Sequence, residues 1–224
     1  QHNLTFGMIY QYSENFVQVF SHDEVVYGKN SMLLKMAAES IGAKAGNLRS
    51  LYTLMWGWPG KKTLFMGCEF GQSREWAYDQ QLDWNLLQYQ DHRGIQKVIT
   101  DLNALYRDEP TFAWGDTHAE GFEWITHADS ESSVIAFIRK NESFTDVYLV
   151  VGHYTPGVRH GYSVGVPLKG RWREVINSDS TIYGGLGEGN LGGVNSEDIP
   201  WDGHPFSLPL TLPGNSTLIF KYEG

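Results

Sequence analysis

The run His22-Asp23-Glu24 combines residue types that could act on a polar substrate. His22 could hydrogen-bond the hydroxyl groups of such a substrate, and the Asp23 carboxylate could stabilise positive charge developing on, for example, a sugar ring. Taken alone the run is weak evidence, because most His-Asp pairs lie in solvated loops. Its meaning depends on the elements that position it.

Two further carboxylates, Glu69 and Glu75, follow a second apolar run and could reach the same region. Their ordinary role would be an ion pair with Arg74 or contact with a neighbouring helix. We expect no metal site, because the histidines lack the i, i+4 spacing of helical zinc ligands. No cofactor motif is present, and Cys68 is expected to be a buried, inert thiol.

The elements around these residues predict a parallel strand pair. Residues 16–20 read as a buried strand that ends at His22, residues 48–58 as an apolar helix, and residues 62–67 as a second strand. This strand–helix–strand order is typical of a parallel sheet or a (β/α) barrel, in which functional residues collect at strand C-termini. Leu4, Met8 and Tyr12 further predict a short amphipathic helix.

The pattern changes beyond another helical stripe at residues 95–106, and we place a domain boundary near Pro110. Short β-branched and aromatic runs separated by turn residues then predict an antiparallel β-sandwich. The glycine-rich residues 184–193 read as a loop, since no helix follows them. The predicted strands are 122–126, 134–139, 147–151, 172–176 and 217–222.

Composition excludes several classes of protein. The net charge of −9 shows no basic footprint for nucleic acid or anionic lipid, and no apolar run approaches the ~20 residues of a membrane span. A single cysteine excludes an intrachain disulfide and favours a reducing compartment, so we expect a cytoplasmic protein. The first residues show neither an initiator Met nor a signal sequence, which we interpret as a piece of a longer chain.

Aromatic residues are abundant, with eight Trp and twelve Tyr. Exposed aromatic faces suit the apolar faces of glucose rings, although core packing is the commoner role. Trp56, Trp58, Trp76 and Trp84 cluster in sequence near the predicted strand ends, where they could meet a sugar.

Several motifs together resemble the bacterial glycogen branching enzymes of the α-amylase superfamily. They are residues 20–29 (FSHDEVVYGK), 60–67 (GKKTLFMG) and 82–84 (LDW), followed in the same order by 170–179 (GRWREVINSD), 183–185 (YGG) and 208–213 (LPLTLP). The resemblance covers nearly the whole chain.

The resemblance implies α/β plus all-β architecture. Residues 1–110 would form the C-terminal part of a (β/α)8 barrel, with strands seven and eight at 16–21 and 62–67, and residues 111–224 the C-terminal β-sandwich. Asp23 would be the transition-state stabiliser. The residues expected to bind substrate are His22, Glu24, Lys29, Glu69 and Trp76.

The resemblance implies an enzyme that cleaves an α-1,4 bond of a glucan with retention of anomeric configuration. It then transfers the released glucan chain to a 6-hydroxyl, forming an α-1,6 branch. Its partners would be α-glucans, such as glycogen or amylose-like chains, and the missing N-terminal part of the catalytic domain. Retention needs a nucleophile and an acid about 5–5.5 Å apart, and neither motif is found here. The fragment alone is therefore expected to be inactive.

Two departures from the family pattern stand out. Residues 37–40 (AAES) superficially resemble the acid/base motif, but they follow the seventh strand, where the family has Met-Pro-Gly-Asp, so Glu39 is not taken as the acid. Residues 150–156 (VVGHYTP) depart mildly from the usual Asn-Phe-Thr-Pro.

Two other functions stay open at this point. One is a non-catalytic α-glucan-binding module, and the other is a hydrolase of the same superfamily such as a maltooligosyltrehalose trehalohydrolase. A physical difficulty also follows, because two strands cannot close a barrel. We expect residues 1–110 to expose apolar surface and to be rearranged, paired with another chain or docked on the sandwich.

Overall fold

Two parallel strands, β1 (Val17–Phe20) and β2 (Lys61–Leu64), precede the polar residues singled out in the sequence. They pair from Val17 opposite Lys61 to Phe20 opposite Leu64, and α3 (Ile41–Gly57) connects them. The computed structural model describes residues 5–224 and confirms this strand–helix–strand order. Since parallel strands end at the same edge, the chain leaves β1 and β2 on one side of the pair.

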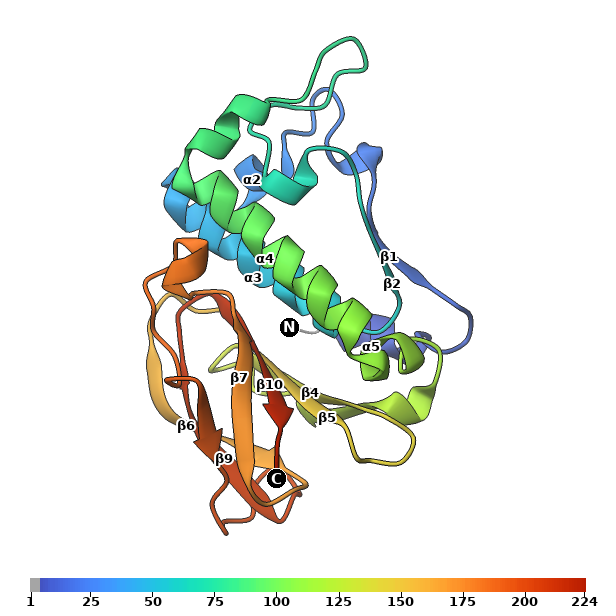
Figure 1. The fold of residues 1–224 in the computed structure, drawn as a ribbon, viewed down its shortest axis with the longest axis vertical. Helices are drawn as coiled ribbons and strands as arrows, with labels where there is room; N and C mark the ends of the chain where they lie inside the picture. The colour runs from blue at the N-terminus through green and yellow to red at the C-terminus, as the bar shows by residue number, and fades with distance from the viewer. Residues whose placement is uncertain (1–4) are drawn as a thin grey trace.

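Two long helices run side by side, α3 and α4 (Gln90–Asp108) (Figure 1). The predicted apolar stripe of α4 is buried against α3, and Pro110 then starts α5 (Pro110–Trp114) at a position where its missing N–H costs nothing. The shorter helical elements are η1 (Phe6–Ile9), η2 (His22–Glu24), α2 (Met32–Lys35), η3 (Cys68–Phe70), η4 (Trp84–Gln88), η5 (Ala119–Gly121) and η6 (Thr181–Tyr183).

The second half of the chain forms two antiparallel sheets. A six-stranded sheet has the order β3-β4-β5-β10-β7-β8, and β6 pairs with β9 in a separate two-stranded sheet. The strands are β3 (Phe122–Thr126), β4 (Val134–Lys140), β5 (Val147–His153), β6 (Arg159–Val166), β7 (Arg171–Asn177), β8 (Gly193–Asn195), β9 (Phe206–Leu212) and β10 (Ser216–Tyr222).

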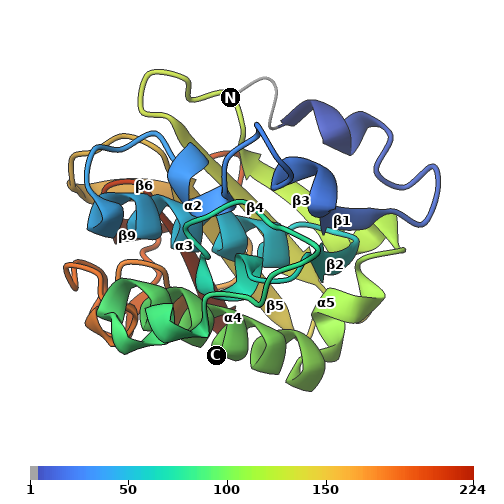
Figure 2. The same ribbon diagram turned by 90° about the horizontal axis from the view of Figure 1, so that it is seen from above.

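The six-stranded sheet is covered on both faces, which explains why β5 is buried at every position. Alternate side chains such as Phe137 and Val150 join a core with α3 and α4, while their neighbours Ile138 and Leu149 pack against β6 and β9. Viewed from above, α3 lies across the sheet, where it contacts β5 and β10, and α4 runs beside α3 (Figure 2). The layers are thus two helices, a large sheet and a small sheet.

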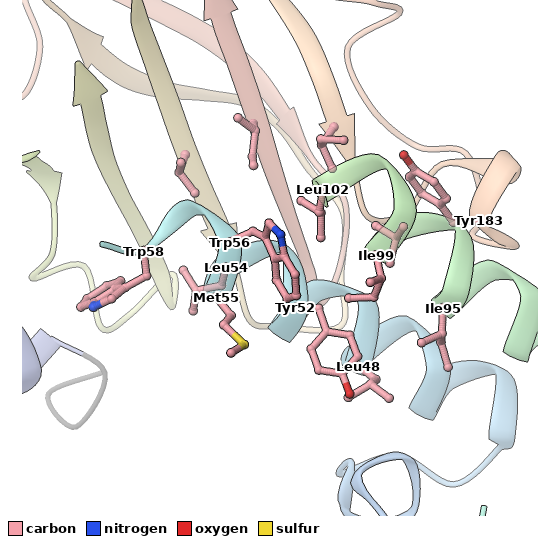
Figure 3. Packing of buried hydrophobic residues seen from close by; sticks show 14 of the residues in the cluster. Leu48, Tyr52, Leu54, Met55, Trp56, Trp58, Ile95, Ile99, Leu102 and Tyr183 are labelled. Atoms are coloured by element: carbon pink, nitrogen blue, oxygen red, sulfur yellow. The ribbon is translucent and has the colours of Figure 1, made fainter. Parts of the chain in front are cut away.

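The helix-facing core is one continuous hydrophobic cluster (Figure 3). Tyr52 and Trp56 from α3 and Ile99 from α4 are buried there together with Tyr183, which follows β7. Polar contacts support the junction: Arg49 Nε donates to Ser178 O at 3.0 Å. Of the arrangements expected for residues 1–110, the structure shows docking on the sandwich.

The expected exposure of apolar surface is also observed, on the strand pair. Val17 and Val19 are each 50% exposed on one face of β1, and within the described residues the two-stranded sheet contains β1 and β2 alone. In the part of the chain that the structure describes, each of the two strands therefore has one edge without a neighbouring strand.

Several predictions of local structure need correction. The predicted helix through Met8 and Tyr12 is a single 3-10 turn, η1, and Leu4 lies outside the described residues. The five predicted sandwich strands are confirmed, but β6, β8 and β9 were missed. The proline at position 209 argued against a strand there, because proline cannot donate a backbone hydrogen bond to a neighbouring strand. It is tolerated in β9 because this small sheet has only two strands among residues 5–224, so β9 is an edge strand. The glycine-rich loop is confirmed, since β8 begins only at Gly193.

Candidate functional site

A capped turn fixes the residues that follow β1. The Ser21 hydroxyl accepts a hydrogen bond from Asp23 N at 3.1 Å, and Ser21 N donates to Glu24 Oε2 at 2.8 Å. This reciprocal capping box turns the chain sharply into η2. Partial burial opposes ionisation of Glu24, but the hydrogen bonds from Ser21 prevail and lower its pKa. Glu24 thus holds the turn, and its predicted contact with substrate stays a prediction.

His22 and Asp23 are presented to solvent by this turn. His22 Nε2 lies 3.4 Å from Asp23 Oδ1, and the two side chains are 56% and 69% exposed. Neither side chain is buried by packing, so both are accessible to a ligand. Lys29 lies in the exposed turn that follows, with its backbone N donating to Val26 O at 3.0 Å.

An aromatic row connects the ends of the two strands. The Phe65 ring, which directly follows β2, lies 5.9 Å from His22 and 5.1 Å from Trp76 between ring centroids. Trp76 is fixed further because its backbone N donates to Val25 O at 2.8 Å. The structure therefore brings His22, Asp23 and Trp76 to the same edge, as the sequence predicted.

Glu69 occupies a different place. It follows β2 within η3 and lines a groove of about 510 Å³ beside that strand, together with Lys61 and Tyr106. The neighbouring Cys68 is buried, as predicted, and burial, followed by the nearby Glu69 and Glu24 charges, raises the pKa of its thiol to about 12. This thiol is a poor nucleophile at neutral pH.

The roles of Arg74 and Glu75 differ from the simple pairing considered for them. Arg74 Nε donates to Asp83 Oδ2 at 2.8 Å, and Glu75 Oε1 accepts a hydrogen bond from Asn30 N at 2.6 Å. Asn30 has φ of +68°, so Glu75 stabilises an unusual backbone turn. Both contacts organise the loops around the strand ends.

The tryptophans divide into buried and accessible ones. Trp56 and Trp58 are 5% and 9% exposed and belong to the hydrophobic core, so they cannot meet a sugar. Trp84 is 52% exposed and its ring packs on Phe70 at 5.0 Å. Sequence reasoning overlooked Trp114 and Trp201, because neither follows a parallel strand.

Residues 5–224 contain no cluster of three or more His, Cys, Asp or Glu side chains placed to hold a metal ion. Within the same residues, no helix combines the length and apolarity needed to cross a membrane.

Both the β-sandwich and the chain as a whole are similar to known proteins. Residues 124–223 match the family described as "Alpha amylase, C-terminal all-beta domain". The chain is 51% identical over 221 residues, 99% of its length, to a protein of Aquifex aeolicus named 1,4-alpha-glucan branching enzyme. A Pseudomonas putida protein of the same name is 49% identical over 221 residues. The chain is thus similar over nearly its whole length to bacterial proteins named 1,4-alpha-glucan branching enzyme.

This similarity confirms the resemblance drawn from the motifs and does not favour the hydrolase or binding-module alternatives. The chain spans 35% of the Aquifex relative and 30% of the Pseudomonas relative, about a third of either protein. Among solved structures, an acarbose-bound α-amylase of Geobacillus thermoleovorans matches with a TM-score of 0.53 and 12% identity. That match covers 92% of this chain and 38% of the amylase. At this identity the likeness concerns the fold alone.

Proposed function

We propose that this chain is the C-terminal part of an enzyme that cleaves α-1,4-glucan bonds and transfers the released chain to a 6-hydroxyl, forming α-1,6 branches in glycogen. The observation that carries the proposal is the 51% identity to a branching enzyme across 99% of this chain. An alignment at that level of identity over 221 residues includes the strand pair with its connecting helix as well as the β-sandwich, which supports the same reaction class. A cytoplasmic location accords with the single, unpaired Cys68.

The strand pair corresponds, in this proposal, to strands seven and eight of a (β/α)8 barrel within residues 1–110, followed by the β-sandwich of residues 111–224. Its support is the parallel register of β1 and β2, joined by a crossover helix. Grooves of about 490 and 510 Å³ flank the two free edges, the first lined by Phe16 and Leu51 and the second by Lys61 and Leu64. The remaining strands would come from preceding polypeptide, the principal protein partner.

The catalytic role of this chain is then electrostatic. The Asp23 carboxylate would stabilise positive charge on the reacting sugar, while His22 hydrogen-bonds its hydroxyls and Trp76 packs against an apolar sugar face. Glu24, Lys29 and Glu69 would contact the glucan more peripherally. Exposure of His22 and Asp23 at the strand ends supports these roles.

Retaining transfer also needs a nucleophile and an acid, which the proposal assigns to preceding polypeptide. The test combines this chain with the remainder of the Aquifex relative, expressed separately, and incubates the mixture with amylose. Loss of iodine colour and new α-1,6 linkages without new reducing ends would support branching. New reducing ends without branches would instead indicate a hydrolase, and branches made by this chain alone would show that it already holds all three carboxylates.

A further inference from the structure

A cleft of about 730 Å³ lies on the sandwich side of the molecule, remote in sequence from the strand ends. The end of α5, the start of β3 and the β4–β5 turn enclose it. It shares no lining residue with the edge that presents Asp23. Its lining combines aromatic rings with charged and hydrogen-bonding groups, namely Trp114, His118, Glu120, Glu123, Lys140 and Phe144.

The Trp114 ring is held in one orientation. The His118 ring stacks on it with 4.5 Å between centroids and 8° between planes, and His118 Nδ1 lies 2.8 Å from Trp114 O. Gly121 makes room for the arrangement, because a Cβ there would come within 3.1 Å of Trp114 Cζ3 and 2.7 Å of Gly115 Cα. A fixed aromatic surface loses little conformational entropy when a ligand binds.

The opposite wall contains a residue in an unfavourable backbone conformation. Phe144 has φ of +57°, a backbone region that is unfavourable for a bulky residue and that is enriched at functional sites. The Asn141 side chain stabilises this turn by accepting hydrogen bonds from Thr145 N at 2.9 Å and Asp146 N at 3.0 Å. This turn places Phe144 in the lining of the cleft, with Lys140 Nζ 4.8 Å from its ring centre.

A contact between Glu123 and His204 links the cleft to a second opening that contains another tryptophan. Glu123 Oε2 accepts a hydrogen bond from Lys140 Nζ at 2.6 Å, and Glu123 Oε1 lies 3.5 Å from His204 Nε2. His204 and Trp201 line the adjacent opening, and Trp201 is 49% exposed. Asp202, between them in sequence, fixes this turn by accepting a hydrogen bond from Thr126 Oγ1 at 2.8 Å. Glu123 and His204 therefore join the opening lined by Trp114 to the opening lined by Trp201.

The chemistry of this surface selects a ligand class. Three carboxylates against one lysine disfavour phosphate, nucleic acid and anionic lipid. Aromatic faces flanked by carboxylate and amide acceptors suit a neutral ligand that has apolar faces and many hydroxyl groups. We propose that residues between Trp114 and Trp201 form a second saccharide site, distinct from the Asp23 edge, that binds a stretch of linear α-1,4-glucan. The choice of α-glucan among neutral saccharides rests on the proposed function.

The test titrates the full 224-residue chain with maltoheptaose by calorimetry, with cellopentaose as the linkage control. Trp114→Ala should weaken maltoheptaose binding about tenfold and Trp201→Ala about threefold, as expected for loss of one aromatic contact each. Tyr89→Ala removes an aromatic ring that is 56% exposed and lies outside the cleft, and it should leave this binding unchanged. Trp114→Phe, which keeps an aromatic ring, should bind more tightly than Trp114→Ala and guards against a folding defect.

Equal maltoheptaose affinity in wild type, Trp114→Ala and Trp201→Ala would overturn the proposal, as would equal binding of cellopentaose. Branching activity measured in the reassembled enzyme separates the two ideas. If transfer depends on Asp23 while the tryptophan variants bind normally, the second site fails and the proposed function stands. If Trp114 governs binding but the reassembled enzyme makes no branches, the saccharide site stands without it.

Discussion

Asp116 and Arg139 form a buried ion pair, with 3.2 Å between Asp116 Oδ1 and Arg139 Nη2 and side chains that are 1% and 0% exposed. Asp116 Oδ1 also accepts a hydrogen bond from Gly60 N at 2.9 Å, and Arg139 Nη1 donates to Gly57 O at 2.7 Å. The pair thus connects the C-terminal end of α3 and the residues just before β2 to strand β4 of the sandwich.

Asp116→Asn should lower the free energy of unfolding by about 3–5 kcal/mol, because it leaves the Arg139 charge buried without its partner. Urea denaturation measures the loss. Asp198→Asn is the matched control: Asp198 pairs with Lys169 at 2.6 Å, but both side chains are more than half exposed. That change should stay within about 0.5 kcal/mol of wild type, and equal losses in the two variants would contradict the interpretation.

Lys62 predicts a pH dependence of stability at the same junction. Its side chain is 5% exposed, and burial lowers the pKa of its amine to about 7, against the opposing attraction of Asp116 at 3.8 Å. The unfolded chain then binds more protons than the folded chain between about pH 7 and 10, so the Lys62 contribution to stability rises with pH across that window. Below pH 7 the full cost of the buried charge remains.

The measurement compares wild type with Lys62→Met by denaturant titration at pH 7, 8 and 9. The wild type should gain stability relative to the variant by up to about 1.4 kcal/mol per pH unit. Lys169→Met, at a side chain that is 60% exposed, controls for general charge effects and should track wild type. A constant difference between wild type and Lys62→Met would show that Lys62 stays protonated in the folded protein.

The sequence allowed β1, α3, β2 and α4 to be located because each carries a strong periodic pattern or a clear stop such as Pro59-Gly60. It also placed His22, Asp23 and Trp76 at one edge, since parallel strands end together. The Asp116–Arg139 pair could not be predicted, because its partners are 23 residues apart on different elements. The cleft at Trp114 likewise depends on three segments that meet only in the folded chain.

Asp23 and Glu24 are adjacent but should behave differently. Asp23→Asn should leave stability within about 0.5 kcal/mol, because the side chain is 69% exposed, yet lower the transfer rate of the reassembled enzyme by about 10²–10³. Glu24→Gln weakens the capping box and should cost stability, on the order of 1 kcal/mol. Urea denaturation and branching assays on both variants check this, and a stability loss greater for Asp23→Asn would contradict it.

Gly94 in α4 should be intolerant of the smallest side chain. Gly→Ala in a helix ordinarily stabilises by up to about 1 kcal/mol, but a Cβ at Gly94 would lie 1.9 Å from the carbonyl O of Tyr183. The helix or the turn at Tyr183 must move apart, so Gly94→Ala should cost about 1–3 kcal/mol in the free energy of unfolding. Gly46→Ala in α3 is the matched control, because its Cβ would meet only Arg49 Nη2, at 3.7 Å, and should leave stability unchanged or raised. If both variants unfold at the same urea concentration, the close packing of α4 on the sandwich does not limit stability.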